Sequence, residues 1–252
     1  MPRSVDEKRW QRAQEWELAF WLREQKPPIW KRIGLGVLGP LLRPLGSPLA
    51  TGDDWNLWWR EQFDNYEFLP RDLGDYIELG CGPYTNTRLI VKGREARRII
   101  CSDPLAREYL NFKKRWLARA HEKGLVTIDS HAIEELTLSP QSFDTVVLIN
   151  VLDHVLDAER CMEIATGLLR PGGYLIFGQD LADPASFGNR EYEWFEEGHP
   201  IRLTAEDVSP WLKPFETVLE KTVPPRDKRL QTGVLVFAGT KLDSSPAALP
   251  RG

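Results

Sequence analysis

Residues 75–85 of this chain are Asp75-Tyr-Ile-Glu-Leu-Gly-Cys-Gly-Pro-Tyr-Thr85. The first part is short, apolar and bounded by turn-forming residues, which predicts a buried β-strand. Gly80 and Gly82 then allow a sharp turn with a close backbone approach, and a helix can begin from Thr85 onward. Strand, glycine turn and helix N-terminus together form a cradle of nucleotide size, although an ordinary strand-to-helix turn has the same pattern. Because the carboxylate of Glu78 would repel a pyrophosphate, the cradle suits a ligand with an amine or a sulfonium.

Beyond this segment, apolar runs of strand length alternate with helical patterns. This alternation predicts an α/β fold with a doubly wound, mostly parallel sheet. Two final runs, separated by Pro224-Pro225-Arg226-Asp227, predict an antiparallel pair. The predicted strands are 76–79, 98–102, 125–128, 143–150, 174–178, 215–222 and 230–239, and the predicted helices in this region are 85–91, 106–123 and 157–169.

Seven of the ten Trp residues precede the glycine turn. We therefore expect residues 1–70 to form a helical, Trp-rich lid that binds the acceptor, residues 71–242 to form the main domain, and residues 243–252 to be a disordered tail. A first helix is predicted over 4–25 with Ser4 as its cap, and a second over 52–66 with Asp53 or Asp54 as its cap.

Residues 29–49 are apolar, rich in Gly and Pro, and carry only basic charges. This composition suits a lid packed on the domain, and it also suits peripheral contact with a membrane surface or a lipid-linked substrate.

The overall composition is that of an ordinary globular protein. A net charge of -4 over 252 residues gives no reason to expect a nucleic-acid partner. The three Cys are far apart and lack metal-ligand spacing, so we expect reduced core thiols. No signal peptide is visible and no apolar run reaches the roughly 18 residues that span a bilayer. We therefore expect a cytoplasmic location.

Asp103 ends the second predicted strand, 25 residues after Glu78. A carboxylate at that position can accept hydrogen bonds from both ribose hydroxyls, and ligands of such sheets bind at the carboxyl ends of the strands. The turn lacks the third glycine of a dinucleotide fingerprint, because Pro83-Tyr84 follows Gly82. A ribose-bearing ligand other than a dinucleotide is therefore favoured.

Together these segments resemble the class I S-adenosylmethionine-dependent methyltransferases, in particular their small-molecule, methyltransferase type 11-like branch. The resemblance implies a Rossmann-like sheet of seven strands whose last two form the antiparallel hairpin. It also implies S-adenosylmethionine as cofactor and S-adenosylhomocysteine as product. The matching segments are Glu78-Leu-Gly-Cys-Gly82, Ser102-Asp103, Ser142-Phe-Asp-Thr-Val146 with Asn150, and Leu168-Leu-Arg-Pro-Gly-Gly-Tyr-Leu175.

The resemblance also implies which residues hold the cofactor. Glu78 and the glycine turn would lie near the methionyl part, Asp103 on the ribose, Pro104 against the adenine, and Asn150 and Val151 beside the sulfonium. Many relatives carry an Asp that accepts from the adenine amino group at the position of Ala132, so His131, Glu134 or a backbone carbonyl would substitute here. The complete set of implied cofactor residues is Glu78, Gly80, Cys81, Gly82, Asp103, Pro104, Ala132, Ile133, Asn150 and Val151.

Methyl transfer from a sulfonium is an in-line displacement, so the enzyme must align the acceptor, exclude water and remove one proton. His154 follows the fourth strand and is the candidate general base, with Asp153 orienting it or acting itself. Packing of His154 against the cofactor loop is the alternative. His199 lies in an aromatic and acidic loop, 192–200, that suits either contact with the acceptor or a surface role. A divalent metal on Asp153, Asp180, Glu196 or His199 stays open, although no ligand spacing indicates one.

The predicted activity is O-methylation of a small molecule or a glycan hydroxyl. One alternative is a methyltransferase-like binding subunit without catalysis. Another is a nucleic-acid methyltransferase, which the net charge and the absence of an Asn-Pro-Pro-Tyr or Asp-Pro-Pro-Tyr motif after the fourth strand disfavour. The basic residues 113–119 suit a solvated helix face or contact with nucleic acid. The sequence leaves the oligomeric state and the identity of the acceptor open.

Overall fold

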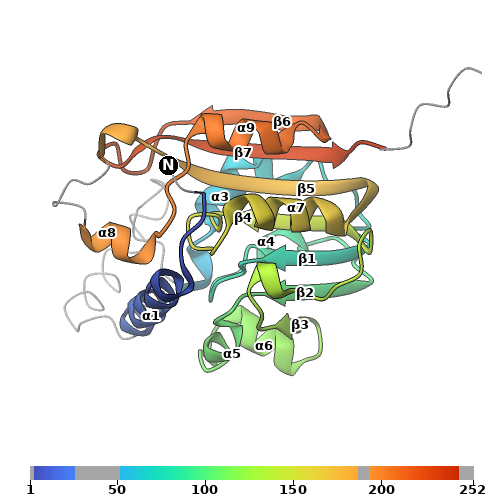
Figure 1. Cartoon of the computed structure of the whole chain (residues 1–252). Helices are drawn as coiled ribbons and strands as arrows, with labels where there is room; N and C mark the ends of the chain where they lie inside the picture. Colours follow the sequence, from blue (N-terminus) through green and yellow to red (C-terminus); the bar gives the residue numbers. More distant parts are fainter. Residues whose placement is uncertain (1–2, 26–51, 187–192, 244–252) are drawn as a thin grey trace, which may run out of the picture.

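A computed structural model describes residues 3–25, 52–186 and 193–243. It shows a seven-stranded sheet in the order β3-β2-β1-β4-β5-β7-β6, in which β7 runs antiparallel to both of its neighbours and the first five strands are parallel (Figure 1). The predicted doubly wound sheet with a terminal hairpin is confirmed. The strands are β1 Asp75–Leu79, β2 Arg98–Ser102, β3 Thr127–Asp129, β4 Phe143–Ile149, β5 Leu169–Ala182, β6 Phe215–Val223 and β7 Gln231–Lys241.

Helices cover both faces of this sheet, because strand side chains alternate between them. On β1, Tyr76 packs into one core, while Ile77 and Leu79 pack into the other. The Tyr76 face is covered by α3 and α4, and the opposite face by α7 and α9 (Figure 1). The helices are α1 Glu7–Glu24, α3 Leu57–Gln62, α4 Thr87–Ile90, α5 Ala106–Tyr109, α6 Trp116–Glu122, α7 Ala158–Leu168, α8 Glu193–Gly198 and α9 Ala205–Leu212, with short 3-10 turns at η2 Gly52–Asp54, η3 Asp64–Tyr66, η4 Ile133–Glu135 and η5 Pro184–Ser186.

The single helix predicted over 106–123 is wrong, because the chain forms two short helices there. Between them Phe112 is buried and Arg115 is extended, with φ -87° and ψ 155°. The amide of Trp116 then donates to the Asp53 carboxylate at 3.0 Å. A side chain from a distant segment therefore caps the start of α6, and local periodicity gives no sign of it.

The continuous helix predicted over 52–66 is also wrong. Only Leu57–Gln62 is α-helical, and Asn56 precedes it without a side-chain cap. Asp64, Asn65 and Tyr66 all have positive φ, at 48°, 56° and 61°. Tyr66 is fully buried and stacks on Phe63, so burial of these rings outweighs helical continuity.

Two further local expectations require correction. The N-cap of α1 is Asp6, which accepts from the Arg9 amide at 2.7 Å, whereas Ser4 forms a bridge with Asp157. The predicted loop 192–200 contains the helix α8.

Other sequence predictions have mixed outcomes. All three cysteines are free and buried, as expected. No helix in the described part of the chain is long and apolar enough to cross a membrane. The segment 29–49 and residues 244–252 lie outside the described residues, so the predictions for the apolar lid and the tail stay predictions.

Candidate active site

A cavity of about 460 Å³ lies where the parallel strands end, and α1 and α8 lie beside that edge of the sheet (Figure 1). Its walls come from α1, α3, the glycine turn, the ends of β2, β4 and β5, and the loop between β6 and β7. Eleven of the thirteen predicted site residues line it, and Glu78 and Asp153 do not. Those that line it are Gly80, Cys81, Gly82, Asp103, Pro104, Ala132, Ile133, Asn150, Val151, His154 and His199.

The two glycines of the turn are required for different reasons. Gly80 has φ +67°, and a Cβ built on it would lie 2.4 Å from Cγ1 of Val151. Gly82 has φ +56°, but no described atom lies within 4 Å of the position of its Cβ. Left-handed backbone favours glycine at both positions, and packing excludes a side chain at the first only. The space above Gly82 is therefore available to a ligand.

Glu78 does not face the cavity, contrary to the sequence-based expectation. Its carboxylate is buried and accepts hydrogen bonds from the amides of Asn86 and Thr87, both at 2.9 Å, and from the hydroxyls of Thr85 and Thr87. Burial raises the pKa of Glu78 above its ordinary value, and these hydrogen bonds oppose the rise. Glu78 thus fixes the path of the chain from the glycine turn into α4, and its effect on a ligand is indirect.

Asp103, which the sequence predicts to bind a ribose, lies directly after β2 and lines the cavity. One carboxylate oxygen accepts from the Leu105 amide at 2.8 Å and the other from the Gly82 amide at 2.9 Å. Burial, followed by the nearby charge of Glu17, raises the pKa of Asp103 to about 7. Each oxygen keeps acceptor capacity toward the cavity, so two ribose hydroxyls fit this group. The link between Gly82 and Asp103 also ties the glycine turn to the end of β2.

The region expected to hold adenine contains no direct replacement for the missing Asp. The side chain of His131 is 65% exposed and pairs with Asp129 at 2.7 Å. Glu134 lines the cavity, but one of its oxygens accepts from the amides of Leu156 and Asp157 at 3.0 and 2.9 Å. Because its other oxygen makes neither of these bonds, Glu134 and a backbone carbonyl both stay open as acceptors for the adenine amino group.

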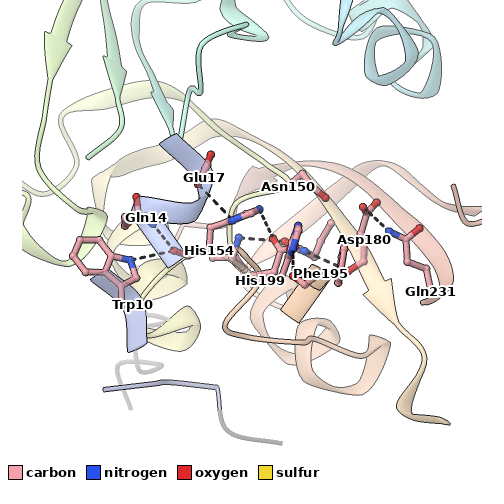
Figure 2. A network of polar contacts seen from close by, with 12 residues as sticks. Trp10, Gln14, Glu17, Asn150, His154, Asp180, Phe195, His199 and Gln231 are labelled. Carbon is pink, nitrogen blue, oxygen red and sulfur yellow. Dashed lines mark hydrogen bonds and ion pairs between the residues drawn. The ribbon is translucent and has the colours of Figure 1, made fainter. Parts of the chain in front are cut away.

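His154 and His199 lie side by side in the cavity wall (Figure 2), and their potential ligand atoms and those of Asp153 all lie within 4.8 Å of one another. The Asp153 carboxylate is 3.9 Å from Nε2 of His154 and 4.0 Å from Nε2 of His199. Nδ1 of His154 is 3.6 Å from the Glu17 carboxylate of α1. This nitrogen is buried and has no hydrogen-bond partner among the described residues.

The charges of this cluster follow from its surroundings. Burial opposes the charged form of His154, but Asp153 and Glu17 outweigh it and raise the pKa of His154. Burial and the neighbouring His154 lower the pKa of His199 to about 3, so His199 is neutral at pH 7. Its Nδ1 then donates to the Phe195 carbonyl at 2.8 Å. The pKa of Asp153 is lowered, because the two imidazoles outweigh its burial.

Helix α1 is hydrogen-bonded to the backbone of this cluster at His154. Nε1 of Trp10 and Nε2 of Gln14 each donate to the His154 carbonyl at 3.1 Å (Figure 2). The helix that carries Glu17 is therefore anchored to the loop after β4 by two side chains on the same face.

A metal ion was considered from the sequence on Asp153, Asp180, Glu196 or His199. In the described part of the chain, the group whose potential ligand atoms lie within 4.8 Å of one another is Asp153, His154 and His199. Asp180 instead pairs with Arg226, and Glu196 lies 3.9 Å from Arg202. The two carboxylates beside His154 favour a proton on its ring, which competes with coordination.

Three cavity residues were not singled out from the sequence as site residues, although two of them lie in the predicted acceptor-binding segment 1–70. Glu17 belongs to a helix face, Trp59 to an aromatic helix, and Arg226 to the turn between the last two strands. Asp180 was considered from the sequence only as a metal ligand. It is polar and comes shortly after the predicted apolar strand 174–178, and in the structure it lies near the end of β5. A search for polar residues at the carboxyl ends of all predicted strands would have included it.

Comparison with known proteins agrees with this geometry. The family described as a methyltransferase domain matches residues 77–177. The N-methyltransferase NodS from Bradyrhizobium japonicum WM9, solved with S-adenosyl-L-homocysteine, has a TM-score of 0.55 at 18% identity, covering 79% of this chain and 97% of that chain. The [4+2]-cyclase SpnF has a TM-score of 0.57 at 17% identity, covering 84% of this chain and 96% of that chain.

A curated relative is an uncharacterized 37.1 kDa protein in transposon TN4556 of Streptomyces fradiae. It is 27% identical over 131 residues, which is 52% of this chain, and the match spans 36% of the length of that relative.

The sheet order, the glycine turn tied to Asp103 and the family match agree on one class of protein. Residues 77–177 match the methyltransferase-domain family, and the chain has the fold of the class I S-adenosylmethionine-dependent methyltransferases. S-adenosylmethionine is the cofactor that this class uses.

Proposed function

We propose that this protein transfers a methyl group from S-adenosylmethionine to a hydroxyl oxygen of a small molecule or glycan. One observation carries the proposal. The carboxylate of Asp103 and the imidazole of His154 line one cavity, after strands β2 and β4, with the glycine turn beside them.

The residues present fit the cofactor. The left-handed turn leaves free space above Gly82, and Asp103 keeps acceptor capacity toward that space. Pro104 and Ile133 would contact the adenine, and Asn150 would lie near the sulfonium. When bound, the cofactor supplies a methyl group on a positively charged sulfur, which is a good leaving group.

The proton of the acceptor hydroxyl is assigned to His154. Its Nδ1 is buried and has no hydrogen-bond partner in the described ranges, so this atom can take a proton. The imidazolium that forms lies between the carboxylates of Asp153 and Glu17, which stabilise it. General bases placed in this way typically contribute 10²–10⁴-fold to the rate.

Exclusion of water is assigned to the aromatic wall that α1 contributes. Trp16 and Phe20 stack at 5.6 Å between ring centroids, and both line the cavity. Trp21 continues this wall and contacts Tyr84 of the glycine turn at 5.3 Å. These contacts support the proposal that α1 acts as a lid over cofactor and acceptor.

The test is transfer of radiolabelled methyl from S-adenosylmethionine to a panel of phenols, hydroxylated rings and methyl glycosides, together with the matching amines. We expect transfer to at least one hydroxyl, reduced by 10²-fold or more in His154→Gln, with Glu216→Gln on the exposed face of β6 as the control. Transfer to amines alone, with His154→Gln within about threefold of wild type, would contradict O-methylation and the role of the base.

A further inference from the structure

Asp180 is a second buried carboxylate of the cavity, at the opposite end from Asp103. Asp103 follows β2 and Asp180 lies in β5, three strand positions away in the sheet order. At about 4.8 Å per strand, the two ends lie about 14 Å apart. Asn150 follows β4, the strand between β1 and β5. Because the sulfonium is expected beside Asn150, Asp180 lies on the acceptor side of the transferred methyl group.

Only one of the two Asp180 oxygens is paired. Oδ2 accepts from the guanidinium of Arg226 and from Nε2 of Gln231, the latter at 2.7 Å (Figure 2). Oδ1 is buried and finds no hydrogen-bond partner among residues 3–25, 52–186 and 193–243. Buried carboxylate oxygens are ordinarily paired, so an unpaired one in a cavity wall is suited to a donor from a ligand.

Trp59 forms a rigid aromatic wall in the same part of the cavity. A Cβ at Gly178, two residues before Asp180, would lie 2.6 Å from the indole of Trp59, so only glycine allows this ring to approach β5. On Trp59 the guanidinium of Arg226 lies 5.3 Å from the ring centroid. The indole is thereby held between the strand and a cation that is itself fixed by Asp180.

The geometry points to an acceptor subsite in which Oδ1 of Asp180 accepts a hydrogen bond from a hydroxyl of an uncharged ring that lies against the edge of Trp59 in the cavity wall. A phenolic ring and the flat face of a pyranose share this chemistry. An anionic substituent would be repelled by the unpaired carboxylate oxygen. The Arg226 guanidinium is paired with Oδ2 of Asp180, so its charge is not available to offset this repulsion. This inference rests on the proposed function and specifies its acceptor class.

The experiment uses the full chain saturated with S-adenosylhomocysteine, whose binding is first measured by calorimetry. Ligand-observed NMR titrations then compare resorcinol, its dimethyl ether, 3-hydroxybenzoate and methyl β-D-glucopyranoside. We expect resorcinol or the glucoside to bind at least about tenfold more tightly than the diether, because sites built for a hydroxyl reject the analogue without it. The two hydroxylated probes distinguish a phenolic from a sugar acceptor.

The Asp180→Asn variant tests whether the preference for a hydroxyl depends on Asp180. Its amide oxygen can still accept from Arg226, which turns the amide NH₂ toward the cavity, so the preference for resorcinol over the diether should fall below about threefold. Glu216→Gln, an exposed acid outside the cavity, should keep the wild-type preference. If Asp180→Asn does not fold, the wild-type comparison of resorcinol with its diether decides alone.

The outcomes separate the two proposals. Failure of S-adenosylhomocysteine to bind would overturn the proposed function. If S-adenosylhomocysteine binds normally, three results would overturn the Asp180 subsite and leave the proposed function standing. These are equal binding of resorcinol and its diether, tightest binding of 3-hydroxybenzoate, and no binding of any probe.

Discussion

Gly80→Ala tests the packing that shapes the cofactor turn. The new methyl group would lie 2.4 Å from Cγ1 of Val151 on a backbone with φ +67°. The left-handed backbone costs a non-glycine residue about 1–2 kcal/mol, and overpacking at the clash adds about 1–3 kcal/mol. The free energy of unfolding should therefore fall by about 2–5 kcal/mol, which lowers Tm by about 4–20 °C for a domain of this size.

Two matched glycines separate these contributions. Gly93 has φ +76° and Gly82 has φ +56°, and no described atom lies within 4 Å of either added Cβ. Gly93→Ala and Gly82→Ala should each cost only the backbone share, about 1–2 kcal/mol. Gly82 lines the cavity and Gly93 does not, so only Gly82→Ala of this pair should also weaken binding of S-adenosylhomocysteine.

The assay is a double-mutant cycle with Val151→Ala, read by chemical denaturation and by calorimetry with S-adenosylhomocysteine. Removal of the Val151 methyl groups makes room for the alanine, so the double variant should recover at least about 1 kcal/mol relative to the sum of the single variants. Additive free energies, or equal losses in Gly80→Ala and Gly93→Ala, would refute the reasoning.

Further predictions concern the titratable groups. The pKa of Asp103 is about 7 in the folded protein and about 3.9 in an unfolded chain, so between these pH values the folded state binds one proton more. The contribution of this group to stability is therefore lost as pH rises from about 4 through 7. Asp103→Asn should flatten that part of the curve of unfolding free energy against pH. His154→Gln should lower kcat by about 10²–10⁴-fold and change the Kd of S-adenosylhomocysteine by less than about threefold, and a comparable loss of binding would assign His154 to packing of the cofactor loop instead. Glu17→Gln removes a carboxylate that raises the pKa of His154, so the acidic limb of the pH profile of kcat, where the base loses its proton, should move to lower pH, and an unmoved limb would exclude this coupling.

The sequence was sufficient for the sheet and for most of the residues that the structure brings together at the cavity. Strand β4 is buried at six of its seven positions, so the apolar run 146–149 identifies it directly. Gly80, Gly82 and Asp103 carry a pattern that local backbone chemistry explains, and the structure places all three at one cavity.

What the sequence did not reveal depends on contacts between distant segments. Asp53 caps α6 across 63 residues, which breaks a helix that periodicity predicts as continuous. Glu78 has the right residue type for a ligand, yet three neighbouring residues use its carboxylate. Asp180 and Arg226 meet only because β7 lies beside β5, a pairing that no local pattern encodes.

The central claim is that Asp103 and the glycine turn bind the ribose-bearing cofactor. Calorimetric titration of the wild-type protein and of Asp103→Asn with S-adenosylhomocysteine tests it most directly. At about pH 8, above the pKa of Asp103, we predict one site per chain with Kd below about 100 μM in the wild type, weakened at least about tenfold in the variant, since a hydrogen bond to a charged group contributes about 1.5–3 kcal/mol. No heat of binding at millimolar ligand, or equal affinity in both proteins, would contradict it.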